Sequence, residues 1–240
     1  MKADQHLRVV PSWRLALAPG EGHDFPQTPG WWDLRDLSPE ESDDMPRLRT
    51  ALLRSLPPLP DGCAVLDLGA GTGSLVTLMA AFYPRLRYTL LDANGSALER
   101  AREKVREVVP DLDVSFITES VEASALAPLP GGPFRLVTSS IALHDLVRPA
   151  APENAPGQAR HAEDHRTLLR RVLGALDPGG HFIYADAMRP GFRVMEHLGL
   201  LDEAGFTEVD CAFVAGRFLV CGGQRPNEAS TNQTITKGGQ

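Results

Sequence analysis

The sequence has 240 residues, 42% of them hydrophobic and 23% charged, which is enough ordinary globular chain for one sizeable α/β domain. The net charge is −7 and no basic run occurs, which argues against a DNA- or RNA-binding protein. Three cysteines without a CxxC pair indicate neither a zinc ribbon nor a disulfide framework. Without a signal-peptide core or an apolar run of about 20 residues, we expect a cytoplasmic protein that does not span a membrane.

The chain divides into three predicted parts. Residues 1–45 are rich in Pro, Gly, Trp and acids, and we expect them to form a cap segment. In this segment Trp31 and Trp32 fit either a wall of a substrate pocket or an anchor on the core. Residues 46–222 form the main domain, and the polar residues 223–240 are predicted to be a disordered tail.

The main domain begins with a predicted helix from Pro46, whose leucines fall on one face and which ends before Pro57. Strands and helices then alternate. The predicted strands are 63–69, 87–94, 113–120, 134–143 and 181–187, and the predicted helices are 74–84, 96–109, 161–176 and 195–206.

Two signals refine these elements. Ser96 can cap the helix 96–109, and Gly205 is the expected C′ residue of the helix 195–206. Residues 177–180, DPGG, are predicted to turn the chain, and 207–223 to form a hairpin around Ala215–Gly216. The alternation predicts a doubly wound α/β fold, with a mostly parallel sheet and an antiparallel strand from the closing hairpin.

The glycine-rich stretch AVLDLGAGTGSL, residues 64–75, follows the first strand of this sheet. Ligands bind at such carboxyl ends of parallel strands, and Gly69, Gly71 and Gly73 would let the backbone approach one closely. The spacing is G-x-G-x-G and not the G-x-G-x-x-G of dinucleotide sites, and no Gly-Lys-Ser/Thr of a P-loop follows. A carboxylate at Asp67 would repel a pyrophosphate but attract an ammonium group.

Two further acids end the next strands. Asp92 is placed to accept hydrogen bonds from a ribose diol, and Glu119 from an adenine amino group. The acids could instead merely cap loops, but three at successive strand ends around one glycine loop favour a ligand. Amine, ribose and adenine without phosphate are combined in S-adenosylmethionine.

The chain resembles the class I S-adenosylmethionine-dependent methyltransferases through VLDLGAGTG, LLDANGSALERAR, ITES, LVTSSIALHDL, LDPGGHFIYAD and LLDEAGFTEVD…RFLVCGG, in the family's order over about 60–222. The resemblance implies a seven-stranded sheet with the last strand antiparallel, and a small-molecule type of methyltransferase. It also implies cofactor contacts from the glycine loop and the three strand ends. These are Asp67, Gly69, Ala70, Gly71, Gly73, Asp92, Ala93, Glu119, Ser120 and Ser139, with the backbone near Ser140.

One departure from the family is the position of the extra length. Relatives that act on small molecules often carry an insert after the fifth strand, whereas here the added residues follow the fourth. We expect this loop and the N-terminal segment to cover the active site.

The candidate catalytic residues are His144, as a general base or a packing group, and Asp145, which could orient it or bind a substrate amine. His161 and His165, spaced i, i+4, could offer two metal ligands, but no third is marked and we predict no metal. The acceptor is predicted to be a small molecule methylated on O, N or C, in specialised metabolism such as antibiotic biosynthesis. An N-terminal segment packed across subunits would give a homodimer.

Three alternatives remain open from the residues. The same fold can bind S-adenosylmethionine for other chemistry, such as cyclisation or decarboxylation. A nicotinamide-dependent oxidoreductase is disfavoured by Asp67 and by the missing third glycine of the dinucleotide pattern. A degenerate binding subunit is disfavoured by the intact loop and acids.

Overall fold

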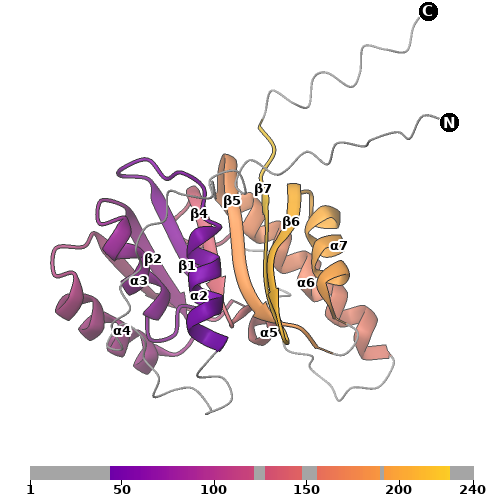
Figure 1. The fold of residues 1–240 in the computed structure, drawn as a ribbon, viewed down its shortest axis with the longest axis horizontal. Coiled ribbons are helices and arrows are strands. Elements are labelled where there is room, and N and C mark those ends of the chain that lie inside the picture. Colours follow the sequence, from indigo (N-terminus) through magenta and orange to yellow (C-terminus); the bar gives the residue numbers. More distant parts are fainter. Residues whose placement is uncertain (1–43, 122–127, 148–155, 190–191, 228–240) are drawn as a thin grey trace, which may run out of the picture.

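The structure is a computed structural model that describes residues 44–121, 128–147, 156–189 and 192–227. Within them the chain forms seven strands in one sheet, in the order β3-β2-β1-β4-β5-β7-β6 (Figure 1). The strands are β1 (Ala64–Leu68), β2 (Arg87–Asp92), β3 (Val114–Thr118), β4 (Phe134–Ser140), β5 (Leu176–Ala187), β6 (Thr207–Ala215) and β7 (Phe218–Gln224). β7 alone runs antiparallel to its neighbours, as predicted, so the seven-stranded, doubly wound fold is confirmed.

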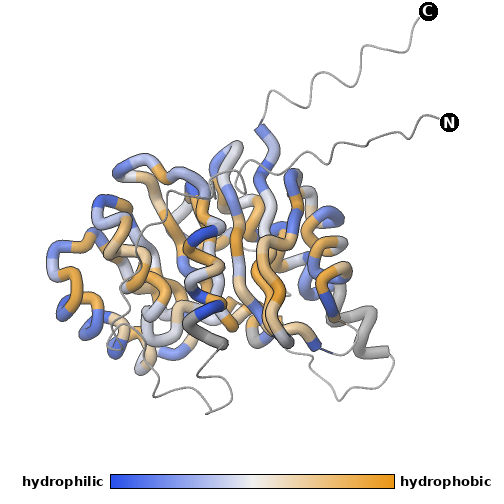
Figure 2. The backbone as a smooth tube through the Cα atoms, in the orientation of Figure 1, coloured by the Kyte–Doolittle hydropathy of each residue, from blue (hydrophilic) through white to orange (hydrophobic). Residues whose placement is uncertain are grey.

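Helices cover both faces of the sheet. One apolar cluster packs α2 (Asp44–Arg54), α3 (Ser74–Phe82) and α4 (Gly95–Val108) on one face, and the other packs α5 (Leu143–Leu146), α6 (Pro156–Ala175) and α7 (Val194–Ala204) on the opposite face. Because both faces are covered, the central strands bury apolar residues on both sides, such as Val65 and Leu66 of β1 and Leu136 and Val137 of β4. Figure 2 shows these hydrophobic stretches in orange, interrupted by hydrophilic segments. None of the helices in the described ranges is both long and apolar enough to span a bilayer.

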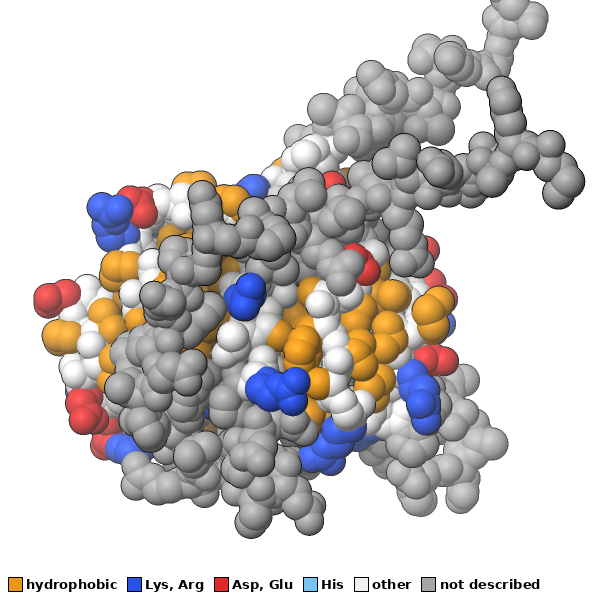
Figure 3. Space-filling view, in the orientation of Figure 1, with side chains coloured by type: hydrophobic (Ala, Val, Ile, Leu, Met, Phe, Trp, Pro, Cys, Tyr) orange, Lys and Arg blue, Asp and Glu red, His pale blue; other side chains and the backbone are white. Residues whose placement is uncertain are grey.

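The predicted helix from Pro46 is α2, which begins two residues earlier. It contacts β5, β6 and β7. Figure 1 shows it in front of the sheet, between β1 and β5. The four leucines that share its apolar face and the chain just beyond it are buried as expected: Leu48, Leu52, Leu53 and Leu56. Beyond α2 the same sheet face stays partly open, and Figure 3 shows hydrophobic side chains over β6 and β7, where Ala212 and Phe213 are half-buried.

Three local predictions were wrong. Asn94, not Ser96, caps α4, because the Asn94 side chain accepts the Ala97 N–H at 3.2 Å. The DPGG stretch does not separate α6 from β5 but lies within β5, where Gly179 donates its N–H to Arg225 at 3.0 Å. β7 also runs to Gln224, one residue past the predicted hairpin of 207–223.

Other expectations hold or lie outside the described ranges. Gly205 ends α7 with a φ of 102°, as its position predicted. The cap segment 1–45, except for its last two residues, and the tail from 228 onward are not described. The same is true of residues 148–155 in the predicted loop after β4, while α6 begins at Pro156, five residues before the helix we expected.

The glycine loop gives a test of the local packing. Gly71 and Gly73 both have positive φ, of 53° and 72°, but a Cβ on Gly71 would meet nothing within 4 Å, whereas one on Gly73 would lie 2.8 Å from the Ala101 Cβ. Gly71→Ala should therefore cost only the backbone strain, about 1–2 kcal/mol. Gly73→Ala should cost about 1–3 kcal/mol more, because the α3–α4 contact must also shift.

Urea unfolding of the ligand-free protein measures both free energies of unfolding. Equal losses for the two variants would show that the α3–α4 contact does not restrict residue 73.

Candidate cofactor and acceptor site

A cavity of about 690 Å³ lies at the carboxyl ends of β1, β2 and β4. The strand order reverses between β1 and β4, which is where open α/β sheets bind ligands. Its volume falls within the usual range for small-molecule sites. Seven of the ten predicted cofactor residues line it: Asp67, Gly69, Ala70, Gly71, Asp92, Ala93 and Glu119.

The glycine loop needs its glycines for two different reasons. All three have positive φ, between 53° and 72°, a region that side chains rarely adopt. A Cβ on Gly69 would lie 2.4 Å from the Ala142 Cβ, so Gly69 lets the loop pack against the chain after β4. Gly71 instead faces open space and presents bare backbone to the cavity.

The carboxylate of Asp92 holds this loop in place. One carboxylate oxygen accepts the Gly71 N–H at 2.8 Å, and the other accepts the Asn94 N–H, also at 2.8 Å. Each oxygen retains a second lone pair that can accept a further hydrogen bond. Asp92 can therefore position the loop and still receive the two hydroxyls of a ribose.

Asp67 is 2% exposed, yet it forms part of the cavity wall. Burial raises the pKa of this carboxyl to about 7, although the Thr138 hydroxyl donates to it at 3.2 Å and the Arg49 charge opposes the shift. A carboxyl in this condition gains most from a cationic ligand group, which restores the charge that burial disfavours.

Two positively charged side chains near the cavity were not identified from the sequence. Arg49 of α2 lines the cavity, and nothing in the amphipathic pattern of that helix marked it as different from other surface arginines. Lys104 of α4 donates to the hydroxyls of Thr72 and Ser74, at 3.2 and 3.1 Å. These two hydrogen bonds connect α4 to the glycine loop and to the start of α3.

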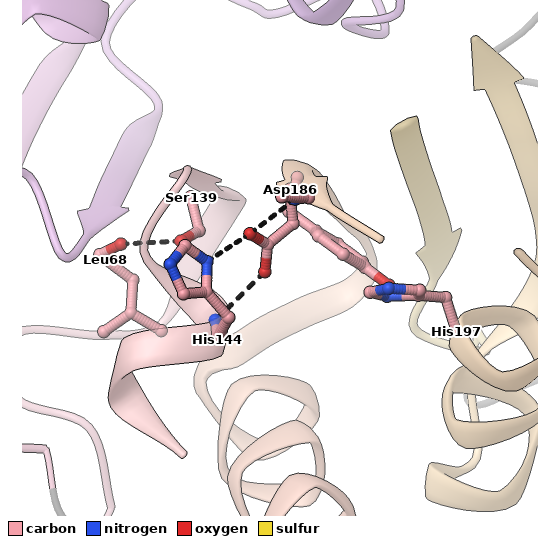
Figure 4. A network of polar contacts seen from close by, with 7 residues as sticks. Leu68, Ser139, His144, Asp186 and His197 are labelled. Carbon is pink, nitrogen blue, oxygen red and sulfur yellow. Dashed lines mark hydrogen bonds and ion pairs between the residues drawn. The ribbon is translucent and has the colours of Figure 1, made fainter. Parts of the chain in front are cut away.

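Three predicted cofactor residues do not line the cavity. Gly73 caps the start of α3, and Ser120 is exposed one residue beyond Glu119. The Ser139 hydroxyl donates to the Leu68 carbonyl at 2.8 Å, which turns it toward β1, and the next residue, Ser140, lines the wall instead (Figure 4).

His144 of α5 lies in the chain between Ala142 and Leu146, which line the cavity, and it faces Asp186 at the end of β5 (Figure 4). Neither His144 nor Asp186 is itself a lining residue. The His144 Nδ1 lies 2.5 Å from one carboxylate oxygen of Asp186, and the His144 backbone N–H donates to the other at 3.0 Å. Asp186 is 1% exposed, while the imidazole is partly open. Such a carboxylate fixes the tautomer and the orientation of the ring.

The sequence signal for Asp186 was present but unused, because it ends a strand as Asp67 and Asp92 do. Asp145, which we expected either to orient His144 or to bind a substrate amine, belongs to α5, but its side chain is outside the described part. Among the described residues, no group of three His, Cys, Asp or Glu side chains could hold a metal ion.

Comparisons with known proteins agree with this arrangement. Residues 59–208 match a family described as "Methyltransferase domain". The chain is 31% identical to a demethylmenaquinone methyltransferase of Chlamydia trachomatis over 52% of this chain and 45% of that protein. It is 34% identical to a release factor glutamine methyltransferase of Deinococcus radiodurans, over 48% of this chain and 42% of that one. The matched part thus spans less than half the length of these relatives.

A solved structure shares the fold. It is the N-methyltransferase NodS of Bradyrhizobium japonicum in complex with S-adenosyl-L-homocysteine, 19% identical, with a TM-score of 0.56 over 90% of this chain and all of that one. Because the family match takes in well over half of the sequence, the chain belongs to the class I S-adenosylmethionine-dependent methyltransferases.

Proposed function

We propose that this chain transfers a methyl group from S-adenosylmethionine to an acceptor atom that must lose a proton, such as a hydroxyl oxygen or an acidic carbon. The observation that carries the proposal is that two features lie at the carboxyl ends of the parallel strands. One is the cavity lined by three carboxylates and the guanidinium of Arg49. The other is the pair of His144 and Asp186 beside it.

The charges of the cavity fit the cofactor group by group. The buried Asp67 would pair with its ammonium group, and Arg49 with its carboxylate. Asp92 would accept from the ribose hydroxyls, and Glu119 from the adenine amino group. When bound, S-adenosylmethionine supplies a methyl group activated by a positively charged sulfur.

The remaining chemistry belongs to the chain. The His144 imidazole, held by Asp186 through Nδ1, would take the proton of the acceptor at Nε2 in the neutral tautomer. A neutral amine needs no such base, so the pair favours an oxygen or carbon acceptor over nitrogen. Asp186 acts through His144 and is a positioning residue, because its carboxylate is occupied by the ring and by the His144 backbone.

The acceptor that we propose is a small molecule. Support comes from the lack of a basic run in the sequence, which disfavours nucleic acid, and from the first relative, whose name gives a quinone precursor as its acceptor. The release factor named for the second relative makes a protein acceptor the alternative to test. Specialised metabolism, a cytoplasmic location and a homodimer remain predictions from the sequence.

The deciding experiment incubates the purified chain with S-adenosylmethionine and a panel of phenols, carboxylic acids, β-dicarbonyl compounds and amines. Formation of S-adenosylhomocysteine together with a methylated phenol, acid or carbon acid is the expected result. Methylation of amines alone would contradict the base assigned to His144. Consumption of the cofactor without S-adenosylhomocysteine would replace methyl transfer by other chemistry of the same fold.

Removal of the Asp92 carboxylate should weaken cofactor binding. In Asp92→Ala the ribose acceptor and the anchor of the Gly71 N–H are both lost, so affinity for S-adenosylmethionine should fall by about 1–3 kcal/mol. Calorimetric titration measures the change, with the exposed Asp111→Ala as the matched control. Wild-type affinity in Asp92→Ala would remove Asp92 from the site.

Cofactor affinity should also depend on pH through Asp67. Because its pKa is raised to about 7, the ligand-free site takes up a proton as the pH falls through neutrality and loses its attraction for the ammonium group. The dissociation constant should rise about fivefold from pH 7 to pH 6. Asp67→Asn should bind more weakly at pH 7 and lack this dependence; if the variant kept it, another group would be responsible.

Loss of the His144–Asp186 pair should lower turnover and leave cofactor binding unchanged. His144→Ala and Asp186→Asn should each lower kcat by about a hundredfold or more, with the loss smaller at high pH as the acceptor ionises unaided. Affinity for S-adenosylmethionine should stay near wild type, as measured by titration. His181→Gln, in the middle of β5, is the matched histidine control. Turnover that survives in His144→Ala would leave the ring a packing role.

A further inference from the structure

Cys211 and Cys221 face each other across the last two strands of the sheet. They are direct partners in the antiparallel register of β6 and β7, and both belong to the apolar cluster on the α6–α7 face. Residues opposed in this way have Cα atoms about 4.5–5.5 Å apart and point to the same face. Disulfides need a Cα separation of about 4.4–6.8 Å, so the backbone already has the required spacing.

The two thiols are also in contact. A hydrogen bond with Cys211, together with burial, raises the pKa of the Cys221 thiol well above its usual range. The Cys211 sulfur in addition donates to the Phe213 carbonyl at 3.3 Å.

We propose that Cys211 and Cys221 form a reversible disulfide when the protein meets a peroxide. The half-buried Cys211 reacts first, because Cys221 has no exposed surface. The Cys211 thiolate attacks the O–O bond, giving a sulfenic acid and one water. The Cys221 sulfur then attacks the Cys211 sulfur, and the S–O bond breaks to release the second water. Two thiols lose two electrons, and one peroxide becomes two waters.

The position of β6 makes the second step feasible. β6 is the last strand of the sheet and pairs only with β7 in the described fold, so local opening there can expose Cys221 without breaking the central sheet. Once formed, the bond would fasten this outer strand to its neighbour. Neither strand lines the cofactor cavity, so the proposal stands apart from the proposed function.

The test uses the folded, full-length chain. The reduced protein is treated with hydrogen peroxide, free thiols are alkylated after unfolding in acid, and the non-reduced peptides are mapped by mass spectrometry. One intramolecular link between the Cys211 and Cys221 peptides, reversed by dithiothreitol, is expected, with Cys63 recovered as an alkylated thiol. Sulfinic acid at Cys211 with Cys221 alkylated, or both thiols intact, would overturn the proposal.

Variants separate this link from other effects of oxidation. Cys63→Ser should keep the link, and Cys211→Ser should abolish it at the half-buried position, where folding is least at risk. Oxidation should raise the thermal unfolding midpoint of the wild type and of Cys63→Ser but not of Cys211→Ser. S-adenosylmethionine affinity should be unchanged by the link. A midpoint that rises equally in Cys211→Ser would assign the stabilisation to another site.

Discussion

The hydrogen bond from the Gly71 N–H to the Asp92 carboxylate ties the loop after β1 to the end of β2. The loop has no regular structure of its own, and its three left-handed glycines would otherwise leave it many conformations. With this bond made, α3 starts in a fixed direction, and the bare backbone at Gly71 becomes a wall of the cavity. The carboxylate thus shapes the site before any ligand arrives, which lowers the ordering cost of binding.

The cavity also depends on a segment that precedes the sheet in the chain. The leucines of α2 pack against β5, β6 and β7, and this packing sets the position of Arg49 beside Asp67. A buried carboxyl without a cation nearby tends to become neutral, and one paired too tightly with a cation would not bind another. The Arg49 charge only partly opposes the effect of burial on the pKa of Asp67. The carboxyl is therefore divided between its protonated and ionised forms near neutral pH.

The sequence predicted the order of strands and helices well because apolar periodicity reports burial, and the parallel sheet buries both of its faces. It predicted the Asp67 and Asp92 positions because a strand end next to a glycine loop is a local feature. Features set by contacts between distant residues were missed. The DPGG stretch became strand because Gly179 and Gly180 exchange backbone hydrogen bonds with Arg225, while the register with β4 shifts across it.

In the site, too, the residues that local patterns mark were predicted, and those positioned by contacts between distant residues were not. His144 contacts Asp186, 42 residues away, because the sheet brings the ends of β4 and β5 together. Arg49 likewise acquires its position from helix packing that no local pattern encodes. The Ser139 side chain could not be placed either, since the pleat of β4 decides which of two neighbouring serines faces the cavity.

The outer strand on the other side of the sheet carries a partly exposed aromatic side chain. β3 is the last strand on that side, and its Phe116 is only half-buried. The Arg102 guanidinium of α4 lies 4.4 Å from the centre of that ring, and Glu99 holds the same arginine at 3.5 Å. The guanidinium covers part of a ring that an outer strand would otherwise leave to solvent, so this cation–π contact joins α4 to the last strand of the sheet.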